Sequence, residues 1–236
     1  MRDFCPGELV SYRDDLVIDL SAEQTDPPAP KIIDGKPSYG VRISHGRTVR
    51  RPPGSVRGIT VHQTACVFGT GKATHNLETV KHRRALRVHA HMTVFNTGKA
   101  VLAYPLDWYV YHGNGLNGPS YGLEIEGMYP GLISQPKATT WGGKPTELGA
   151  DQLEAARAGL AYLVERGRAD GNPVEYIWAH RQSSGTRRSD PGEEIWRRLV
   201  LEFAVPVLGL RTEPVMTMKT GRPIPVEWDP SGKGKY

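Results

Sequence analysis

The sequence predicts an α/β fold in which helices flank a mixed central β-sheet. Three observations support this prediction. Short runs rich in β-branched residues alternate with longer segments of helical periodicity, a Gly-containing turn at 96–99 joins two apolar runs, and residues 150–168 carry an apolar stripe at helical spacing. Strands separated by helices favour parallel pairing and a hairpin pairs antiparallel, so the sheet is expected to contain both.

Length and composition indicate one principal core. The 236 residues are enough for a single domain with extensions, and 38% of them are apolar. No run of about 18 apolar residues predicts a membrane span, and the start MRDFCPGELV lacks the apolar segment of a secretory signal. We therefore expect synthesis in the cytoplasm, no signal peptide and no membrane insertion.

The charge balance favours an anionic partner. The net charge is +5 and the pI is about 9.2. Nucleic acid is disfavoured, because the densest basic stretch, KHRRALR at 81–87, contains no aromatic side chain. An anionic polymer of the cell envelope or a carboxylate-bearing peptide fits the charge, and a simple contribution to solubility is the alternative explanation.

The first 54 residues predict an extended arm rather than a second core. DPPAPK, DGKPSYG and RRPPG bring Pro and Gly at a density that interrupts regular structure, and only LVIDL (16–20) has the pattern of a strand. The globular body is predicted at 55–207. A C-terminal extension without clear periodicity follows at 208–236.

The first half of the body predicts a strand, a helix and a hairpin. The β-branched residues of VRGITVH (56–62) are typical of a buried strand, and 71–86 fits a helix with a basic face. VHAHMTVF (88–95) alternates, so His91 is expected to face one side of the sheet and Met92 the other. The turn NTGK then returns the chain through KAVLAYPL.

The second half of the body contains another strand with two acidic residues. In YGLEIEGM (121–128), Leu123 and Ile125 are expected on one side and Glu124 and Glu126 on the other. The remaining predicted elements are a long loop at 128–149, a helix at 150–168, a strand at 173–180 and a helix starting at 190.

Three side chains from distant parts of the chain predict a zinc site. His62 and His180 each end a predicted strand, and Asp190 stands before a Pro-Gly turn. Two imidazoles and a carboxylate form the ligand set of a zinc ion that keeps one position open for water. Each of the three, taken alone, is more often an ordinary core or surface residue. Cys66 has no CxxC partner, and we expect it to be a small buried side chain rather than a ligand.

Five sequence elements carry a family resemblance. In order, they are ITVHQTA, VHAHMTVFNTGKAV, VYHGNG, YGLEIEG and HRQSSGTRRSDPG, within about residues 56–206. The ordered set resembles the zinc-dependent N-acetylmuramoyl-L-alanine amidases of type 2, the family that includes phage lysozyme-amidases and peptidoglycan-recognition proteins. The resemblance implies the peptidoglycan-recognition-protein-like amidase fold, a Zn²⁺ cofactor, and peptidoglycan or muropeptides as the partner. The two end regions lie outside it.

Carried over to this chain, the resemblance implies zinc ligands at His62, His180 and Asp190 and a catalytic carboxylate at Glu124. A carboxylate beside zinc can accept a proton from water and pass it to the leaving amine. Glu126, two residues further on the same face, is the alternative base or a substrate contact.

Three more positions follow from the same resemblance. Arg188 stands where many family members have Lys; it keeps the positive charge that stabilises an oxyanion but cannot shuttle protons. His112 is expected to contact substrate. His91 either lines the substrate groove or packs inside the protein.

The sequence therefore predicts a monomeric zinc hydrolase that cleaves the amide bond between N-acetylmuramic acid and L-alanine. A phage endolysin, released onto the cell wall at lysis, is the preferred role. The alternatives are a non-catalytic peptidoglycan-binding module and a cytosolic muropeptide-recycling amidase. A zinc peptidase of the HExxH type is disfavoured because that motif is absent from the sequence.

Overall fold

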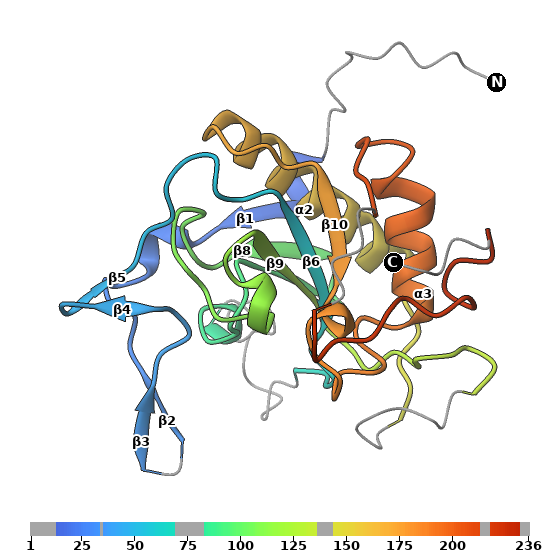
Figure 1. Cartoon of the computed structure of the whole chain (residues 1–236), viewed down its shortest axis with the longest axis horizontal. Coiled ribbons are helices and arrows are strands. Elements are labelled where there is room, and N and C mark those ends of the chain that lie inside the picture. The colour runs from blue at the N-terminus through green and yellow to red at the C-terminus, as the bar shows by residue number, and fades with distance from the viewer. Residues whose placement is uncertain (1–12, 34, 69–82, 136–143, 213–217, 232–236) are drawn as a thin grey trace.

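The computed structural model describes residues 13–33, 35–68, 83–135, 144–212 and 218–231. Its centre is a six-stranded sheet with the order β1-β8-β7-β9-β6-β10 (Figure 1). β7 and β8 pair antiparallel and every other neighbouring pair in this sheet is parallel, which confirms the mixed sheet. The strands are β1 (Val17–Asp19), β6 (Gly58–Gln63), β7 (Met92–Phe95), β8 (Lys99–Leu102), β9 (Ser120–Ile125) and β10 (Tyr176–Ala179).

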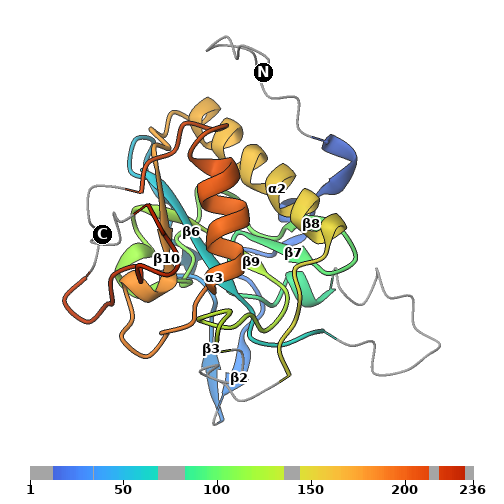
Figure 2. The same ribbon diagram turned by 90° about the vertical axis from the view of Figure 1, so that its right-hand side faces the viewer.

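Two long helical segments cover one face of the sheet (Figure 2). α2 (Ala150–Ala169) packs on β7 and β8. α3 (Glu193–Ile195) continues directly into a π-helix (Trp196–Ala204), which packs on α2 and β10. Among the described residues, no helix is both long enough and apolar enough to cross a membrane.

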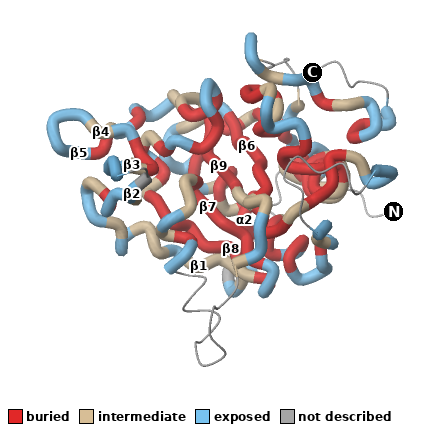
Figure 3. Tube along the Cα trace, turned by 90° about the horizontal axis from the view of Figure 1, so that it is seen from below, coloured by how far each residue is buried: buried red, intermediate tan, exposed pale blue. Residues whose placement is uncertain are grey.

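The alternation of each strand divides the sheet into one face that packs on the helices and an opposite face that carries the predicted site residues. Met92, Leu123 and Val61 belong to the main core beneath the helices. Their neighbours along the strands point to the other face, where Phe95 joins a second cluster with Val101 and other residues. The central strands β6 and β7 are buried along their whole length, and in β9 only Glu124 is partly exposed (Figure 3). The alternation predicted at 88–95 is thus confirmed where β7 forms.

The predicted hairpin at 96–99 is confirmed. β7 and β8 pair through Phe95 and Lys99, and the amide of Gly98 donates to the carbonyl of Phe95 over 3.0 Å. Gly98 has a φ of 76°, a conformation that residues with a Cβ rarely adopt. The helix predicted at 71–86 falls mostly on 69–82, outside the described residues, and residues 83–85 form one helical turn.

The N-terminal arm adds a strand to the sheet and packs on the face opposite the helices. β1 extends the sheet at its edge, where Ile18 pairs with Val101. Two hairpins then project from the body (Figure 1), and Val41 between them is buried in the second cluster. The hairpin strands are β2 (Lys31–Ile33), β3 (Lys36–Ser38), β4 (Ile43–Ser44) and β5 (Arg47–Thr48).

The C-terminal extension is held to the body by buried side chains. Trp228 lies 6.1 Å from Trp196, measured between ring centroids, and its indole N–H donates to the carbonyl of Gly131. The amide of Met218 donates to the carbonyl of Gln182 over 2.7 Å, and the amide of Arg222 donates to that of Arg181 over 2.7 Å. The extension thereby braces the loop that follows β10.

Candidate metal centre

The side chains of the predicted site lie in a row across the ends of parallel strands. His62 of β6 is directly beside Glu124 of β9 in the pairing register, and Glu124 is beside Thr93 of β7. His180 follows the last residue of β10, whose Ala179 pairs with Val61. Neighbouring positions in parallel strands point to the same face, so the sheet itself brings these residues together.

The three predicted ligands converge. One possible ligand atom of each of His62, His180 and Asp190 lies within 4.8 Å of the other two, and all three side chains are buried. His180 Nδ1 is 2.9 Å from Asp190 Oδ2, and the rings of His62 and His180 are 4.4 Å apart. Two of the ligands therefore come from strand ends, and the third is returned by the loop between His180 and α3.

Gln63 fixes the position of this loop, a role that was not predicted from the sequence. Its backbone N–H donates to Asp190 Oδ1 over 3.0 Å. Its side-chain amide donates to the carbonyls of Ser189 and Tyr129, and its Oε1 accepts from the amide of Tyr129 over 2.6 Å. The carboxylate is thus oriented by the residue that follows the first ligand. Its place directly after His62 is the only sequence signal that pointed to it.

A chain of hydrogen bonds defines which nitrogen of His62 is free. His112 Nε2 is 3.2 Å from the carbonyl of Ser120, so this nitrogen carries the proton and donates. His112 Nδ1 must then accept, and the atom 3.1 Å away from it is His62 Nε2, which therefore donates. His62 Nδ1 is left unprotonated and buried, with no hydrogen-bond partner in the described part of the chain.

An unprotonated imidazole nitrogen without a partner is what a metal ligand requires. Burial, together with the charges of His180 and His112, lowers the pKa of His62 well below 6.5. Burial and the charge of Arg51 lower the pKa of His112 to about 3. Both rings are neutral at physiological pH, and the trio fits a divalent ion with an open position.

Gly122 creates the space for this chain of histidines. A Cβ at this position would lie 2.6 Å from Cγ of His112. Glycine is therefore required at this position of the Gly-aliphatic-Glu element for steric reasons, because the ring of His112 lies directly over the strand backbone.

Glu124 has the environment of a proton acceptor. Its Oε2 is buried and lacks a hydrogen-bond partner within the described ranges. Burial, followed by the charge of Asp190, raises the pKa of Glu124 well above 4.5, and the charge of Arg187 opposes this shift. Glu126 differs, because its two oxygens accept the backbone N–H groups of Phe68 and Asn96.

The two adjacent arginines of the loop are placed differently. Arg187 lines a cavity of about 390 Å³ together with His112 and His180. Arg188, the residue implied by the family resemblance, does not line this cavity, although both arginines are exposed. The charge that acts on Glu124 and His62 is that of Arg187. The number of residues between an arginine and Asp190 does not by itself indicate which of the two arginines lines the cavity.

The structure favours one of the two readings of His91 and corrects the expectation for Cys66. His91 is buried with no exposed surface, so it does not line the substrate groove; its Nδ1 accepts from the amide of Gly122 and its Nε2 lies 2.9 Å from Arg51 Nη2. This is the packing role that was the alternative. Cys66 is exposed rather than buried, because the chain turns outward after β6.

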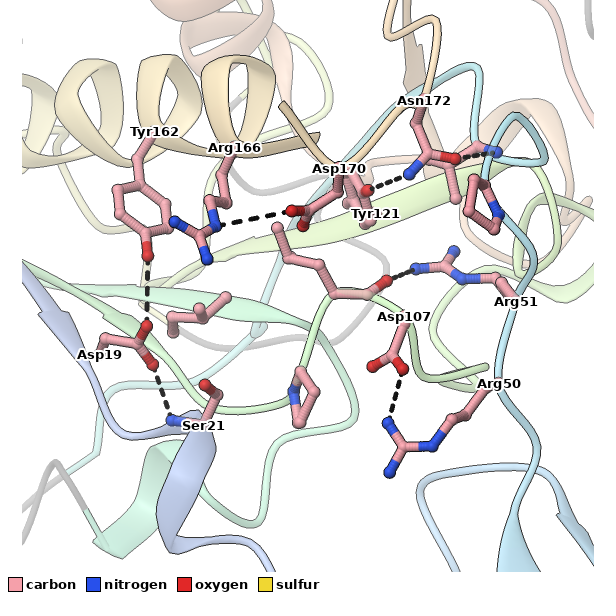
Figure 4. A pocket seen from close by; sticks show the side chains of 15 residues that line it. Asp19, Ser21, Arg50, Arg51, Asp107, Tyr121, Tyr162, Arg166, Asp170 and Asn172 are labelled. Carbon is pink, nitrogen blue, oxygen red and sulfur yellow. Dashed lines mark hydrogen bonds and ion pairs between the residues drawn. The ribbon is translucent and has the colours of Figure 1, made fainter. Parts of the chain in front are cut away.

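A larger cavity, of about 640 Å³, is lined by residues of the arm, β8 and α2 (Figure 4). Its polar side chains bond to one another. Arg50 pairs with Asp107 at 2.5 Å, and Tyr162 donates to Asp19 over 3.2 Å. None of the three predicted metal ligands lines it. Cavity size therefore does not identify the site, whereas the convergence of His62, His180 and Asp190 does.

Comparison with known proteins agrees with the resemblance seen in the sequence. Residues 52–193 match the protein family described as N-acetylmuramoyl-L-alanine amidase. This match spans more than half of the 236 residues. The chain belongs to the N-acetylmuramoyl-L-alanine amidase family. No curated protein matches the chain at a significant level.

The chain is also similar to solved structures. Bumblebee PGRP-SA superposes with a TM-score of 0.50 at 15% sequence identity, over 84% of this chain and 98% of that one. Drosophila PGRP-LB has a TM-score of 0.49 at 15% identity, over 84% and 97% of the two chains. The N-acetylmuramoyl-L-alanine amidase LysC from Clostridium intestinale has a TM-score of 0.44 at 15% identity, over 78% and 96%.

Proposed function

We propose that this protein is a zinc-dependent hydrolase that cleaves the amide bond between the lactyl group of N-acetylmuramic acid and L-alanine in peptidoglycan. The observation that carries the proposal is the orphaned Nδ1 of His62 beside His180 and Asp190. A buried nitrogen acceptor without a partner is costly unless a ligand occupies it. Membership of the amidase family supports the reaction.

His62 Nδ1, His180 Nδ1 and a carboxylate oxygen of Asp190 would hold the ion. Zinc in such a site supplies Lewis acidity, which activates water and polarises a carbonyl group. The bond of Gln63 to Asp190 and the bond of His112 to His62 keep two of the ligands oriented.

Glu124 is the proposed base. Its unpartnered Oε2 accepts a proton from the attacking water and returns it to the leaving nitrogen as the carbon–nitrogen bond breaks. Glu126 does not compete for this role, since backbone amides occupy both of its oxygens. Arg187, rather than Arg188, provides the positive charge near the reacting carbonyl oxygen.

Elemental analysis combined with mass spectrometry of digested wall fragments tests the proposal. The purified protein should contain one zinc ion per chain and release peptides with a free L-alanine amino group. Glu124→Gln should keep the zinc and lose turnover, and His180→Ala should lose the zinc. Zinc-loaded protein that binds muropeptides tightly without releasing the amine would show a binding module instead.

We also propose that the enzyme acts on the intact wall as an endolysin. The net charge of +5 supports this role because it favours an anionic polymer. Purified sacculi and soluble muropeptides should both be cleaved, with sacculi cleaved faster at low salt than at high salt. Cleavage of soluble muropeptides alone would indicate a recycling amidase.

A further inference from the structure

The C-terminal extension runs along the loop that leads to Asp190. We call residues 181–189 the ligand loop and residues 218–222 the strap. Carbonyl groups of the ligand loop accept three hydrogen bonds from the strap, so the two segments lie side by side. These bonds run from the amide of Met218 to Gln182 over 2.7 Å, from the amide of Arg222 to Arg181 over 2.7 Å, and from Nε of Arg222 to Gly185 over 3.0 Å.

The two backbones approach so closely that glycine is required on both sides of the contact. A Cβ at Gly221 of the strap would overlap the carbonyl oxygen of Gln182. A Cβ at Gly185 of the ligand loop would lie 2.7 Å from the carbonyl oxygen of Thr220. The obstructing atoms belong to the backbone, so they cannot swing aside as the end of a side chain can. A side chain at either glycine would therefore push the strap and the ligand loop apart.

Arg181 connects the strap to both ends of the ligand loop. Its backbone N–H donates to the carbonyl of Asp190 over 3.1 Å, and its Nη1 donates to the carbonyl of Arg188. Its own carbonyl accepts from the strap. Because Arg181 directly follows His180, one residue joins the strap to the positions of two proposed ligands.

Trp228 anchors the extension just beyond the strap. Its side chain is fully buried, its ring lies 6.1 Å from that of Trp196 between centroids, and its indole N–H donates to the carbonyl of Gly131. The guanidinium group of Arg181 lies over the same ring, 4.9 Å from the centroid. Arg181 is therefore held both by the backbone of the strap and by a side chain fixed in the core.

Closure of the ligand loop contributes to the free energy of metal binding. His180 and Asp190 are ten positions apart in the chain, and the ion requires them side by side. Bringing the ends of a loop together costs conformational entropy. Contacts that keep the loop closed before the ion arrives remove part of this cost, as preorganisation does in binding generally.

We propose that Arg181 and the strap are positioning elements of the metal centre, which keep the ligand loop closed so that His180 and Asp190 meet the ion without rearrangement. This step rests on the metal ligands proposed above. The strap lies outside residues 52–193, the segment that matches the family. The C-terminal extension of this chain therefore contributes to metal binding although none of its residues is a proposed ligand.

Zinc affinity of the full-length protein, measured by competition with a chelator, tests the proposal. Gly221→Ala should weaken zinc binding about tenfold, since loss of the groups that orient metal ligands typically costs about 10- to 100-fold in affinity. Arg181→Met, which removes the bond to the carbonyl of Arg188 and the contact with Trp228, should have a similar effect and is the second variant if Gly221→Ala does not fold. Arg181→Lys keeps a charged donor and should recover part of the loss.

Two controls separate positioning from overall stability. Val226→Ala lies in the same extension, outside the strap, and is 58% exposed, so it should bind zinc like the wild type. Leu163→Ala removes a fully buried side chain of α2 and should lower the midpoint of urea unfolding without changing zinc affinity. A tenfold loss of affinity in Leu163→Ala as well would mean that zinc binding follows global stability, and it would overturn the positioning role.

Amide hydrogen exchange of the metal-free protein provides a readout that does not involve zinc. The amides of Gln63 and Arg181 both donate to Asp190, so they report whether the ligand loop is closed. In Gly221→Ala their exchange should accelerate about tenfold, and by a larger factor than that of the amides of α2, which report on global unfolding.

The outcomes distinguish this role from the metal centre itself. Wild-type zinc affinity in both Gly221→Ala and Arg181→Met would overturn the role of the strap and leave the metal centre intact. A wild-type protein that binds no zinc would refute the proposed metal centre and, with it, this positioning role, whatever the exchange rates.

Discussion

Replacing His112 with Phe tests whether His112, which is not one of the proposed zinc ligands, controls zinc binding by the proposed ligand His62. Phe keeps the ring and removes both nitrogens. The Nε2–H of His62 then loses its acceptor at 3.1 Å, and His62 no longer has a reason to keep Nδ1 unprotonated. The lone pair needed by the metal is present in only a fraction of the molecules.

The expected size of the effect follows from the burial of the pair. His62 and His112 are both buried, and the unsatisfied N–H of His62 costs about 1–3 kcal/mol. Loss of a partner that orients a metal-bound histidine typically weakens metal binding about 10- to 100-fold, or about 1.4–2.8 kcal/mol. The cost of the unsatisfied N–H and the loss of metal affinity are similar in size, because both arise from the loss of the hydrogen bond between His62 and His112.

Competition with a chelator of known affinity measures zinc binding to the wild type and to His112→Phe. His45→Asn serves as the control, since His45 is exposed and its positive φ of 50° is tolerated by Asn. Nitrogen-15 NMR of the metal-free wild type should show the proton of His62 on Nε2. Unchanged zinc affinity in His112→Phe, or a proton on Nδ1 of His62, would refute the reasoning.

The remaining predictions concern neighbouring features. Gly122→Ala should weaken zinc binding in the same assay as His112→Phe, because its Cβ would lie 2.6 Å from Cγ of His112; wild-type affinity would show that the ring can move aside. The pKa of Glu124 is raised in the folded, metal-free protein, so folding disfavours ionisation of its carboxyl group. The free energy of unfolding therefore falls as the pH rises above about 4.5, where this group ionises in the unfolded chain. The melting temperature of Glu124→Gln should therefore exceed that of wild type by more at pH 8 than at pH 5, and a pH-independent difference would contradict the shift. Trp228→Ala should lower the free energy of unfolding in urea by about 3–5 kcal/mol, whereas Val226→Ala, 58% exposed in the same extension, should change it by less than about 0.5 kcal/mol. Equal effects of the two would mean that the extension does not stabilise the body.

Much of the scaffold could be predicted because its signals are local. The alternation in 88–95 indicated which side of β7 enters the core, since successive side chains of a strand point in opposite directions. The stripe at 150–168 corresponds to α2, and the turn NTGK to the β7–β8 hairpin. Each of these patterns depends on residues within a few positions of one another.

The structure of the end regions was harder to predict, because a few contacts with distant residues hold these regions in place. LVIDL contains β1, but its addition to the edge of the main sheet beside β8 depends on residues 100–102. The C-terminal extension has no periodicity, yet Trp228 and Ile224 are buried in the main core. A single large side chain in a core leaves no repeating pattern to read.

For the site, the sequence alone determined the chemical types and their order: two histidines at strand ends, a glutamate on the intervening strand, and an aspartate after a loop. The tertiary structure decided how they are used. It made Gln63 the support of Asp190, oriented His62 through His112, turned Arg187 rather than Arg188 towards the site, and laid the C-terminal extension along the loop that leads to Asp190. These relations join residues far apart in the chain, and they depend on loop closure and strand register, which local patterns of hydrophobicity and charge do not encode.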